Sequence, residues 1–187
     1  MRPQKVLDKD ILIGLTKVFR SKGYEGASLK ELAEATGLKK ASLYHRFPNG
    51  KKEMAEAVFA HVGKWVDHNV FEALLDERFT PKERIKNGLN EIRTLYDHGN
   101  EVCIFRALSM QTGLELFEKQ VNSGMNQWIN VFNEVGLALG FSTADSQKKA
   151  VQVLIEIQGS LIVSKGLGDI SVFEKTLQNI EIKYING

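Results

Sequence analysis

The stretch SLKELAEATGLKKASLYHRFP, residues 28–48, decides the fold of this chain. Ser28 is followed three residues later by Glu31, and this spacing fits a capping box, in which each residue satisfies a backbone amide of the other. The apolar residues that follow lie on one helical face. The pattern predicts a short helix that begins at Ser28 and ends near Gly37.

A second short helix is predicted over residues 39–47, because Pro48-Asn49-Gly50 breaks the helical pattern after it. The tight connection Thr36-Gly37-Leu38 joins the two helices. Two short helices joined in this way are typical of a helix-turn-helix, whose later helix lies in the major groove of DNA.

Helical geometry sorts the residues of this second helix into an inner and an outer face. At about 100° per residue, Leu43 and Phe47 share one face, which predicts that they pack inward. The opposite side displays small or polar residues, which let a helix approach the groove: Ala41 and His45, flanked by Ser42 and Tyr44.

Basic residues stand at both ends of the predicted recognition helix. Lys39 and Lys40 are placed to reach a phosphate or a guanine edge, and the pair Lys51 and Lys52 begins the next helix, where it could clamp the flanking backbone. Tyr44 and His45 are candidate phosphate donors. The full set of predicted DNA-contacting residues is Ser28, Lys39, Lys40, Ala41, Ser42, Tyr44, His45, Arg46, Lys51 and Lys52.

The charge of the chain is divided unequally along its 187 residues. Residues 1–52 carry 12 Lys and Arg against 5 Asp and Glu, a net charge of +7, and the remainder carries 13 against 18, a net charge of −5. This asymmetry indicates that the N-terminal part meets a polyanion and that the rest has another role.

The segments around the helix-turn-helix are also predicted to be helical, so the fold class is all-α. Apolar residues spaced three to four apart predict a first helix that ends at Lys22-Gly23. A long helix over about 51–75 joins the two parts of the chain, and Thr80-Pro81-Lys82-Glu83 is a second capping box that opens a helix over about 81–97. Further helices are predicted at about 103–116, 118–139, 144–165 and 170–184.

In this arrangement the chain resembles the TetR family of bacterial one-component regulators. The resemblance covers about residues 11–54, and the rest is similar as an all-helical domain of suitable length. The residues that carry it are Ile11-Leu12 through Val18-Phe19 to Gly23-Tyr24, then Ser28-Leu29-Lys30-Glu31-Leu32-Ala33 and Gly37-Leu38, and most specifically Leu43-Tyr44-His45-Arg46-Phe47-Pro48.

The resemblance implies a helix-turn-helix DNA-binding domain at residues 1–50 and a ligand-binding and dimerisation domain at 51–187. It implies a homodimer on palindromic operator DNA, most simply a repressor, which a small-molecule inducer releases. Two features depart from the family pattern. Lys39 stands where many members have Ser or Thr, and the segment before Lys51 is one residue longer than usual, which leaves open whether Lys51 or Lys52 contacts phosphate.

Residues 150–163 carry apolar side chains on nearly every face, more than one core stripe requires. This indicates burial on two sides, as in a four-helix dimer interface, whereas a central core helix of a monomer is the alternative. The predicted interface residues are Val151, Leu154, Ile155, Gln158, Leu161, Ile162, Phe173, Leu177 and Ile180.

The predicted domain also contains aromatic and sulfur-containing residues that suit an apolar ligand site, although ordinary core packing explains each of them. The candidate pocket residues are Trp65, Phe105, Met110, Gln111, Met125, Trp128 and Phe132.

Nothing in the sequence predicts catalysis, a metal or a cofactor. His61 and His68 are too far apart on one helix for the usual pair of metal ligands, and no motif surrounds His98 and the single cysteine, Cys103. One cysteine and no signal peptide favour the cytoplasm, and no segment predicts a membrane span. The alternative function is a helical interaction protein without a small-molecule ligand.

Overall fold

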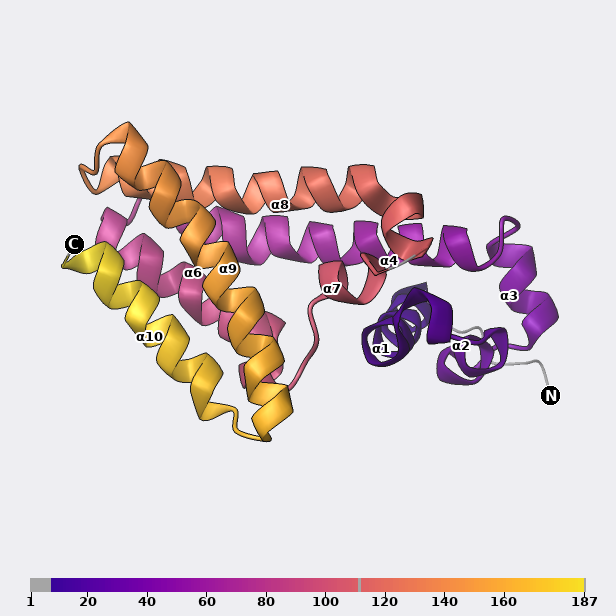
Figure 1. The fold of residues 1–187 in the computed structure, drawn as a ribbon. Helices are drawn as coiled ribbons and strands as arrows, with labels where there is room; N and C mark the ends of the chain where they lie inside the picture. The colour runs from indigo at the N-terminus through magenta and orange to yellow at the C-terminus, as the bar shows by residue number, and fades with distance from the viewer. Residues whose placement is uncertain (1–7, 111, 187) are drawn as a thin grey trace. The chain divides into compact units, whose positions relative to one another are not determined.

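The computed structural model describes residues 8–110 and 112–186, and these contain helices and no strand, which confirms the all-α prediction (Figure 1). The chain forms two compact units. Unit 1 takes the residues up to Gly63 together with Ile104–Val121, and unit 2 takes Lys64–Cys103 together with the residues from Asn122 onward. The units therefore divide the chain differently from the predicted domains 1–50 and 51–187.

Unit 1 is built on α1 (Asp8–Gly26), α2 (Leu29–Thr36), α3 (Lys40–Arg46) and the first part of α4 (Lys51–Val66). α1 and α2 approach closely at Gly14, where a Cβ atom would lie 2.3 Å from the carbonyl oxygen of Ala35. Only glycine fits at this crossing. The core of the unit contains Ile11, Leu15, Phe19, Leu32, Leu43 and Met54.

Residues 104–121 join unit 1 from a distant part of the sequence as α7 (Ile104–Leu108) and the start of α8 (Thr112–Ala138). The ring of Phe117 packs against Tyr24 at 5.2 Å and against Phe59 at 5.5 Å between centroids. The carboxylate of Glu25 also accepts a hydrogen bond of 3.0 Å from the backbone amide of Gly113. These contacts bind the segment to the end of α1 and to α4.

The prediction of one helix over 103–116 was wrong, whereas the predicted boundary before the helix at 118–139 coincides with a kink at Phe117. The first segment instead contains the five-residue α7, and the chain then turns before α8, which continues through Phe117 with one non-helical residue. The chain approaches itself closely here, since a Cβ atom at Gly113 would lie 2.7 Å from the carbonyl oxygen of Leu108. Helical spacing alone did not reveal this reversal.

Unit 2 contains the end of α4, a π-helical turn at Asp67–Phe71, α5 (Glu72–Leu75), α6 (Pro81–Leu95), most of α8, α9 (Thr143–Leu167) and α10 (Ser171–Ile185). The predicted capping box at the start of α6 is present: the Thr80 hydroxyl accepts from the amide of Glu83, and the Glu83 carboxylate accepts from the amide of Thr80. α9 packs along α10. By length and composition α9 could also span a membrane, although a single helix of this kind is weak evidence for a membrane span.

A row of aromatic side chains fills the core of unit 2. Trp128 meets Phe71 edge to face at 5.4 Å and stacks on Phe132 at 6.3 Å. The ring of Tyr184 packs against Phe132 at 6.0 Å, and its hydroxyl donates to the carbonyl of Phe132 at 3.4 Å. Burial raises the pKa of Tyr184 above its ordinary value. These rings link α8 to α10 and to the π-helical turn.

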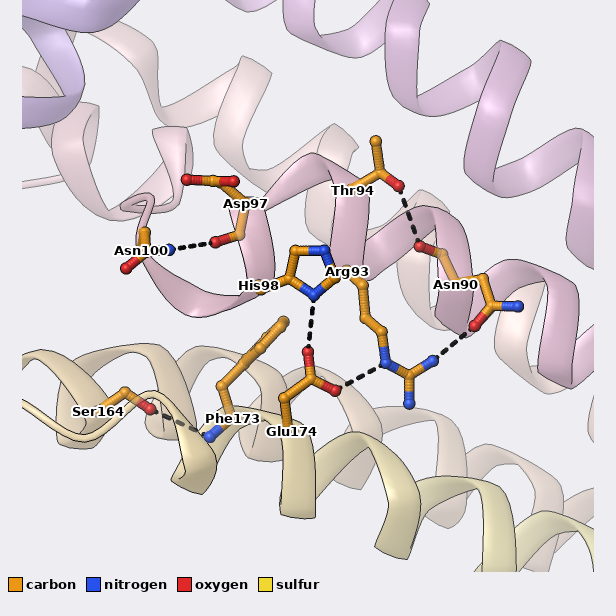
Figure 2. A network of polar contacts seen from close by, with 9 residues as sticks. All are labelled: Asn90, Arg93, Thr94, Asp97, His98, Asn100, Ser164, Phe173 and Glu174. Carbon is orange, nitrogen blue, oxygen red and sulfur yellow. Dashed lines mark hydrogen bonds and ion pairs between the residues drawn. The ribbon is translucent and has the colours of Figure 1, made fainter.

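Glu174 of α10 holds a left-handed turn that follows α6 (Figure 2). Its carboxylate accepts from Arg93 Nε at 2.8 Å and contacts His98 Nδ1 at 3.1 Å. Asp97 and His98 have φ of 44° and 54°, a region that costs roughly 1–3 kcal/mol per non-glycine residue unless neighbours fix it. Partial burial raises the pKa of Glu174, but the hydrogen bonds from Arg93 and His98 outweigh it and hold the pKa below its ordinary value.

We expect Glu174→Gln to lower the free energy of unfolding by about 1 kcal/mol near neutral pH, because it removes the charge that Arg93 and His98 contact. A carboxylate with a lowered pKa stabilises the fold above its unfolded-state pKa and loses this effect as the pH falls through its folded-state pKa. The difference between variant and natural protein should therefore shrink in acid.

Urea unfolding at neutral pH and in acid measures this difference. Glu134→Gln is the matched control, because Glu134 is exposed on α8 of the same unit, and we expect it to change stability by less than about 0.5 kcal/mol. An equal effect of both substitutions at neutral pH would contradict a role of Glu174 in holding the turn.

Candidate nucleic-acid interface

The first helix of the predicted helix-turn-helix begins and ends as the sequence predicts. The Ser28 hydroxyl accepts from the amide of Glu31 at 3.2 Å, and the Glu31 carboxylate accepts from the Ser28 amide at 3.0 Å and from its hydroxyl at 2.7 Å. These bonds lower the pKa of Glu31. At the other end Gly37 adopts the left-handed conformation, with φ of 66°, and ends α2. The exposed hydroxyl of Ser28 is thus already engaged in capping.

The second helix, α3, has the inner and outer faces that its spacing predicts. Leu43 is 1% exposed and belongs to the core, and Phe47, just after the helix, is half-buried. The outward positions expose Ala41, Ser42, Tyr44 and His45. The burial of Leu43 therefore fixes which residues of α3 face solvent.

The N-terminus of α3 carries two exposed lysines. Lys39 is the N-cap residue, in extended conformation, and its side chain makes no capping hydrogen bond. Its carbonyl accepts the first helical hydrogen bond, from Leu43 at 3.0 Å. The ammonium groups of Lys39 and Lys40 are left to solvent, beside the outward face of α3.

The C-terminal end of α3 meets the start of α1. Arg46 forms an ion pair with Asp8. His45 and Arg46 also border a groove whose other walls include Ile11 and Leu12 of α1. Arg46 would therefore have to keep its contact with Asp8 of α1 while it contacts a phosphate. The sequence did not indicate this ion pair, because Asp8 and Arg46 are 38 positions apart.

The two lysines that begin α4 have different surroundings. Lys51 is half-buried, and its ammonium donates to the carbonyl of Tyr24 at 2.8 Å and lies over the Tyr24 ring, 4.6 Å from its centroid. Lys52 is exposed, and its nearest carboxylate, that of Glu56, is 3.9 Å away. The amide of Asn49 donates to Glu53 at 2.8 Å, so a carboxylate already occupies the start of this helix.

The residues predicted for a dimer interface fall into two groups. Leu161, Phe173, Leu177 and Ile180 are buried within unit 2 and form part of its core. The remaining five, all on α9, are exposed or half-buried: Val151, Leu154, Ile155, Gln158 and Ile162.

Other residues of α9 border a groove between α9 and α10. Its lining includes Gly159, Val163 and Thr176, together with the ion pair of Glu156 with Lys183 at 2.5 Å. The sequence did not indicate this ion pair, because 27 residues separate Glu156 from Lys183.

The candidate pocket residues are divided between the units. Trp128 and Phe132 are buried in the aromatic row of unit 2, and the half-buried Trp65 and Met125 also lie in unit 2. Phe105 packs on Phe59 in unit 1, Met110 is exposed, and Gln111 lies outside the described residues. Across the described ranges, no group of His, Cys, Asp or Glu is arranged to hold a metal ion.

Comparison with known proteins identifies the N-terminal part. A family model described as bacterial regulatory proteins, tetR family, matches residues 11–58. An uncharacterised HTH-type transcriptional regulator of Bacillus subtilis, YxaF, is 26% identical over 158 residues, which cover 82% of both chains.

The fold is also similar to solved structures over nearly the whole chain. A TetR transcriptional regulator from Legionella pneumophila superposes with a TM-score of 0.82 at 21% identity, over 98% of this chain and 99% of that one. The TetR family regulator CifR, solved as a cysteine mutant in complex with double-stranded operator DNA, superposes with a TM-score of 0.74 at 21% identity, over 97% of this chain and 98% of that one.

Proposed function

We propose that this chain is a DNA-binding transcriptional regulator of the TetR family, a class without enzymatic activity, and that it represses transcription by occupying operator DNA as a homodimer. A small molecule bound to the C-terminal helices would release it. The cytoplasm, where bacterial DNA lies, is the proposed location. The observation that carries the proposal is the outward face of α3, with small residues in its middle and lysines at its N-terminus, over the buried Leu43.

In this proposal the outward face of α3 enters the major groove. Ala41 and Ser42 are small enough for the helix to approach the bases, and Lys39 and Lys40 reach a phosphate or a guanine edge from the helix start. Tyr44 is 44% exposed and is placed to donate to a phosphate. Ser28 and Arg46 are proposed to contact the backbone while keeping their partners Glu31 and Asp8.

We expect the double variant Lys39→Ala/Tyr44→Ala to lose retention of specific DNA while its fold and oligomeric state survive, since both side chains are exposed. The loss of a phosphate contact should also flatten the dependence of binding on salt, by about 0.9 per contact on a log-log plot.

The measurement is fluorescence anisotropy with a duplex that the natural protein selects from a random pool. Lys64→Ala, an exposed lysine later in α4, is the control for loss of charge, and it should bind as the natural protein does. Normal retention by the double variant would refute the assignment of α3 as the recognition helix.

The exposed side of α9 is the proposed dimer surface. Ile155 and Ile162 are 57% and 51% exposed, seven residues apart on one face, and Val151 and Leu154 extend the same apolar strip. Large apolar side chains in a row on a surface mark an interface. A twofold axis across this strip would pair α9 and α10 of each copy in a four-helix bundle, and a palindromic operator requires such symmetry.

We expect Ile155→Glu to convert the dimer into a monomer, because it places a charge in the middle of this strip at the twofold contact. Leu137→Glu is the matched control, since Leu137 is a comparably exposed apolar residue on α8. Sedimentation equilibrium distinguishes the two variants. A monomeric natural protein, or a dimeric Ile155→Glu variant, would exclude this surface.

The ligand proposal rests on the aromatic residues of unit 2. Trp65, Met125, Trp128 and Phe132 are the candidate lining that this unit offers, and Phe105 and Met110 are candidates in unit 1. An apolar or aromatic effector fits such a lining best. The competing function, a helical interaction protein without a ligand, explains the same residues as core, and the basic helix-turn-helix argues against it.

Tryptophan fluorescence tests for the effector, because Trp65 and Trp128 are the two tryptophans of the chain. We expect an inducer to change this emission saturably and to weaken binding to the selected duplex over the same concentration range, since it must bind the two states of the regulator with different affinity. Trp65→Phe and Trp128→Phe assign the signal. A compound that saturates the signal and leaves DNA affinity unchanged would contradict the switch.

A further inference from the structure

We infer that Lys51 is a positioning residue, which fixes the start of α4 to the end of α1, and that Lys52 makes the phosphate contact at this end of the recognition helix. The inference rests on the proposed function in one respect, that α3 binds operator DNA. Lys51 and Lys52 are adjacent and look equivalent in the sequence, but the inference gives them different roles.

The ammonium of Lys51 lies in a cradle of backbone oxygens. It donates to the carbonyl of Tyr24 at 2.8 Å, lies 3.3 Å from that of Ala27, and is 3.5 Å from that of Glu25. The Tyr24 ring adds a cation–π contact, with Nζ 4.6 Å from its centroid. An ammonium has three N–H donors, and these three backbone oxygens offer one acceptor for each of them.

Electrostatics favour this position for a cation. The carbonyl groups that Lys51 meets belong to residues after Gly23, whose non-helical φ of 71° interrupts α1, and carbonyl groups at the end of a helix lack intrahelical partners. Lys51 stands in the first turn of α4, where the positive end of that helix disfavours a lysine. The Lys51 side chain therefore extends away from the start of α4 and places its ammonium at the end of α1.

The Lys51 contact fixes the two ends of the segment that contains α2 and α3. α2 and α3 lie between the end of α1 and the start of α4 in the chain, and Lys51 closes that loop by joining Ala27, just before α2, to α4, just after α3. A phosphate contact by Lys51 would require the ammonium to leave these carbonyls. Lys52 has no such partners, and its side chain is half-exposed near Glu56.

The two roles predict different effects for the matched variants Lys51→Met and Lys52→Met, which keep the aliphatic stem and remove the charge. Lys52→Met should reduce the slope of log affinity against log salt by about 0.9 and leave thermal stability unchanged. Lys51→Met should leave the slope unchanged and lower the midpoint of thermal unfolding.

A readout of positioning separates this role from simple stabilisation. At a temperature where circular dichroism shows both proteins folded, we expect Lys51→Met to lower the ratio of affinity for the selected duplex over a scrambled duplex by about tenfold, the order of one lost base contact. A side chain that only stabilised the fold would leave this ratio unchanged.

If Lys51→Met does not fold, Lys51→Arg replaces it. A planar guanidinium keeps the charge but does not direct its donors to these three carbonyls as an ammonium does, so the ratio should fall while the salt slope stays that of the natural protein. A flattened slope for Lys51→Met, or an unchanged ratio for Lys51→Arg, would overturn the inference. Failure of the natural protein to distinguish the two duplexes would instead refute the proposed function.

Discussion

The helix-turn-helix depends on the burial of Leu32 and Leu43 in the core of unit 1. α2 and α3 have eight and seven residues, and helices of this length are not stable in water by themselves. Their apolar residues must therefore be buried for them to form at all. The same burial turns Ala41, Ser42 and Tyr44 outward, so the interaction that stabilises α3 also selects the residues that it offers to DNA.

Backbone geometry reinforces this arrangement at the ends of the helices. The Ser28–Glu31 capping box begins α2, the left-handed Gly37 ends it, and Lys51 caps the carbonyls at the end of α1. Each contact satisfies backbone groups that a short helix would leave unpaired. Both neighbours of α3 in the chain are therefore fixed in place, as the proposed reading of a base sequence by α3 requires.

The part of the chain after residue 63 contributes to unit 1 as well as to unit 2. Residues 104–121 pack in unit 1 through Phe117 and Gly113, although they lie between two segments of unit 2 in the sequence. A few residues before this segment, the chain makes the left-handed turn at Asp97 and His98, which Glu174 of α10 holds in place. Because it lies between two segments of unit 2 in the chain, the segment 104–121 links the two units covalently.

The sequence by itself determined the all-helical fold, both capping boxes, the turn at Gly37 and the inner and outer faces of α3, because these depend on spacing within a few residues. It also identified the TetR resemblance from the same local pattern. Only the tertiary structure decided that α7 and the start of α8 pack in unit 1, that Lys51 caps α1, that Arg46 pairs with Asp8, and that Leu161 and Phe173 are core residues whereas Ile155 and Ile162 are exposed. Each of these depends on residues far apart in the chain, and helical periodicity carries no information about which distant side chain or carbonyl a residue will meet.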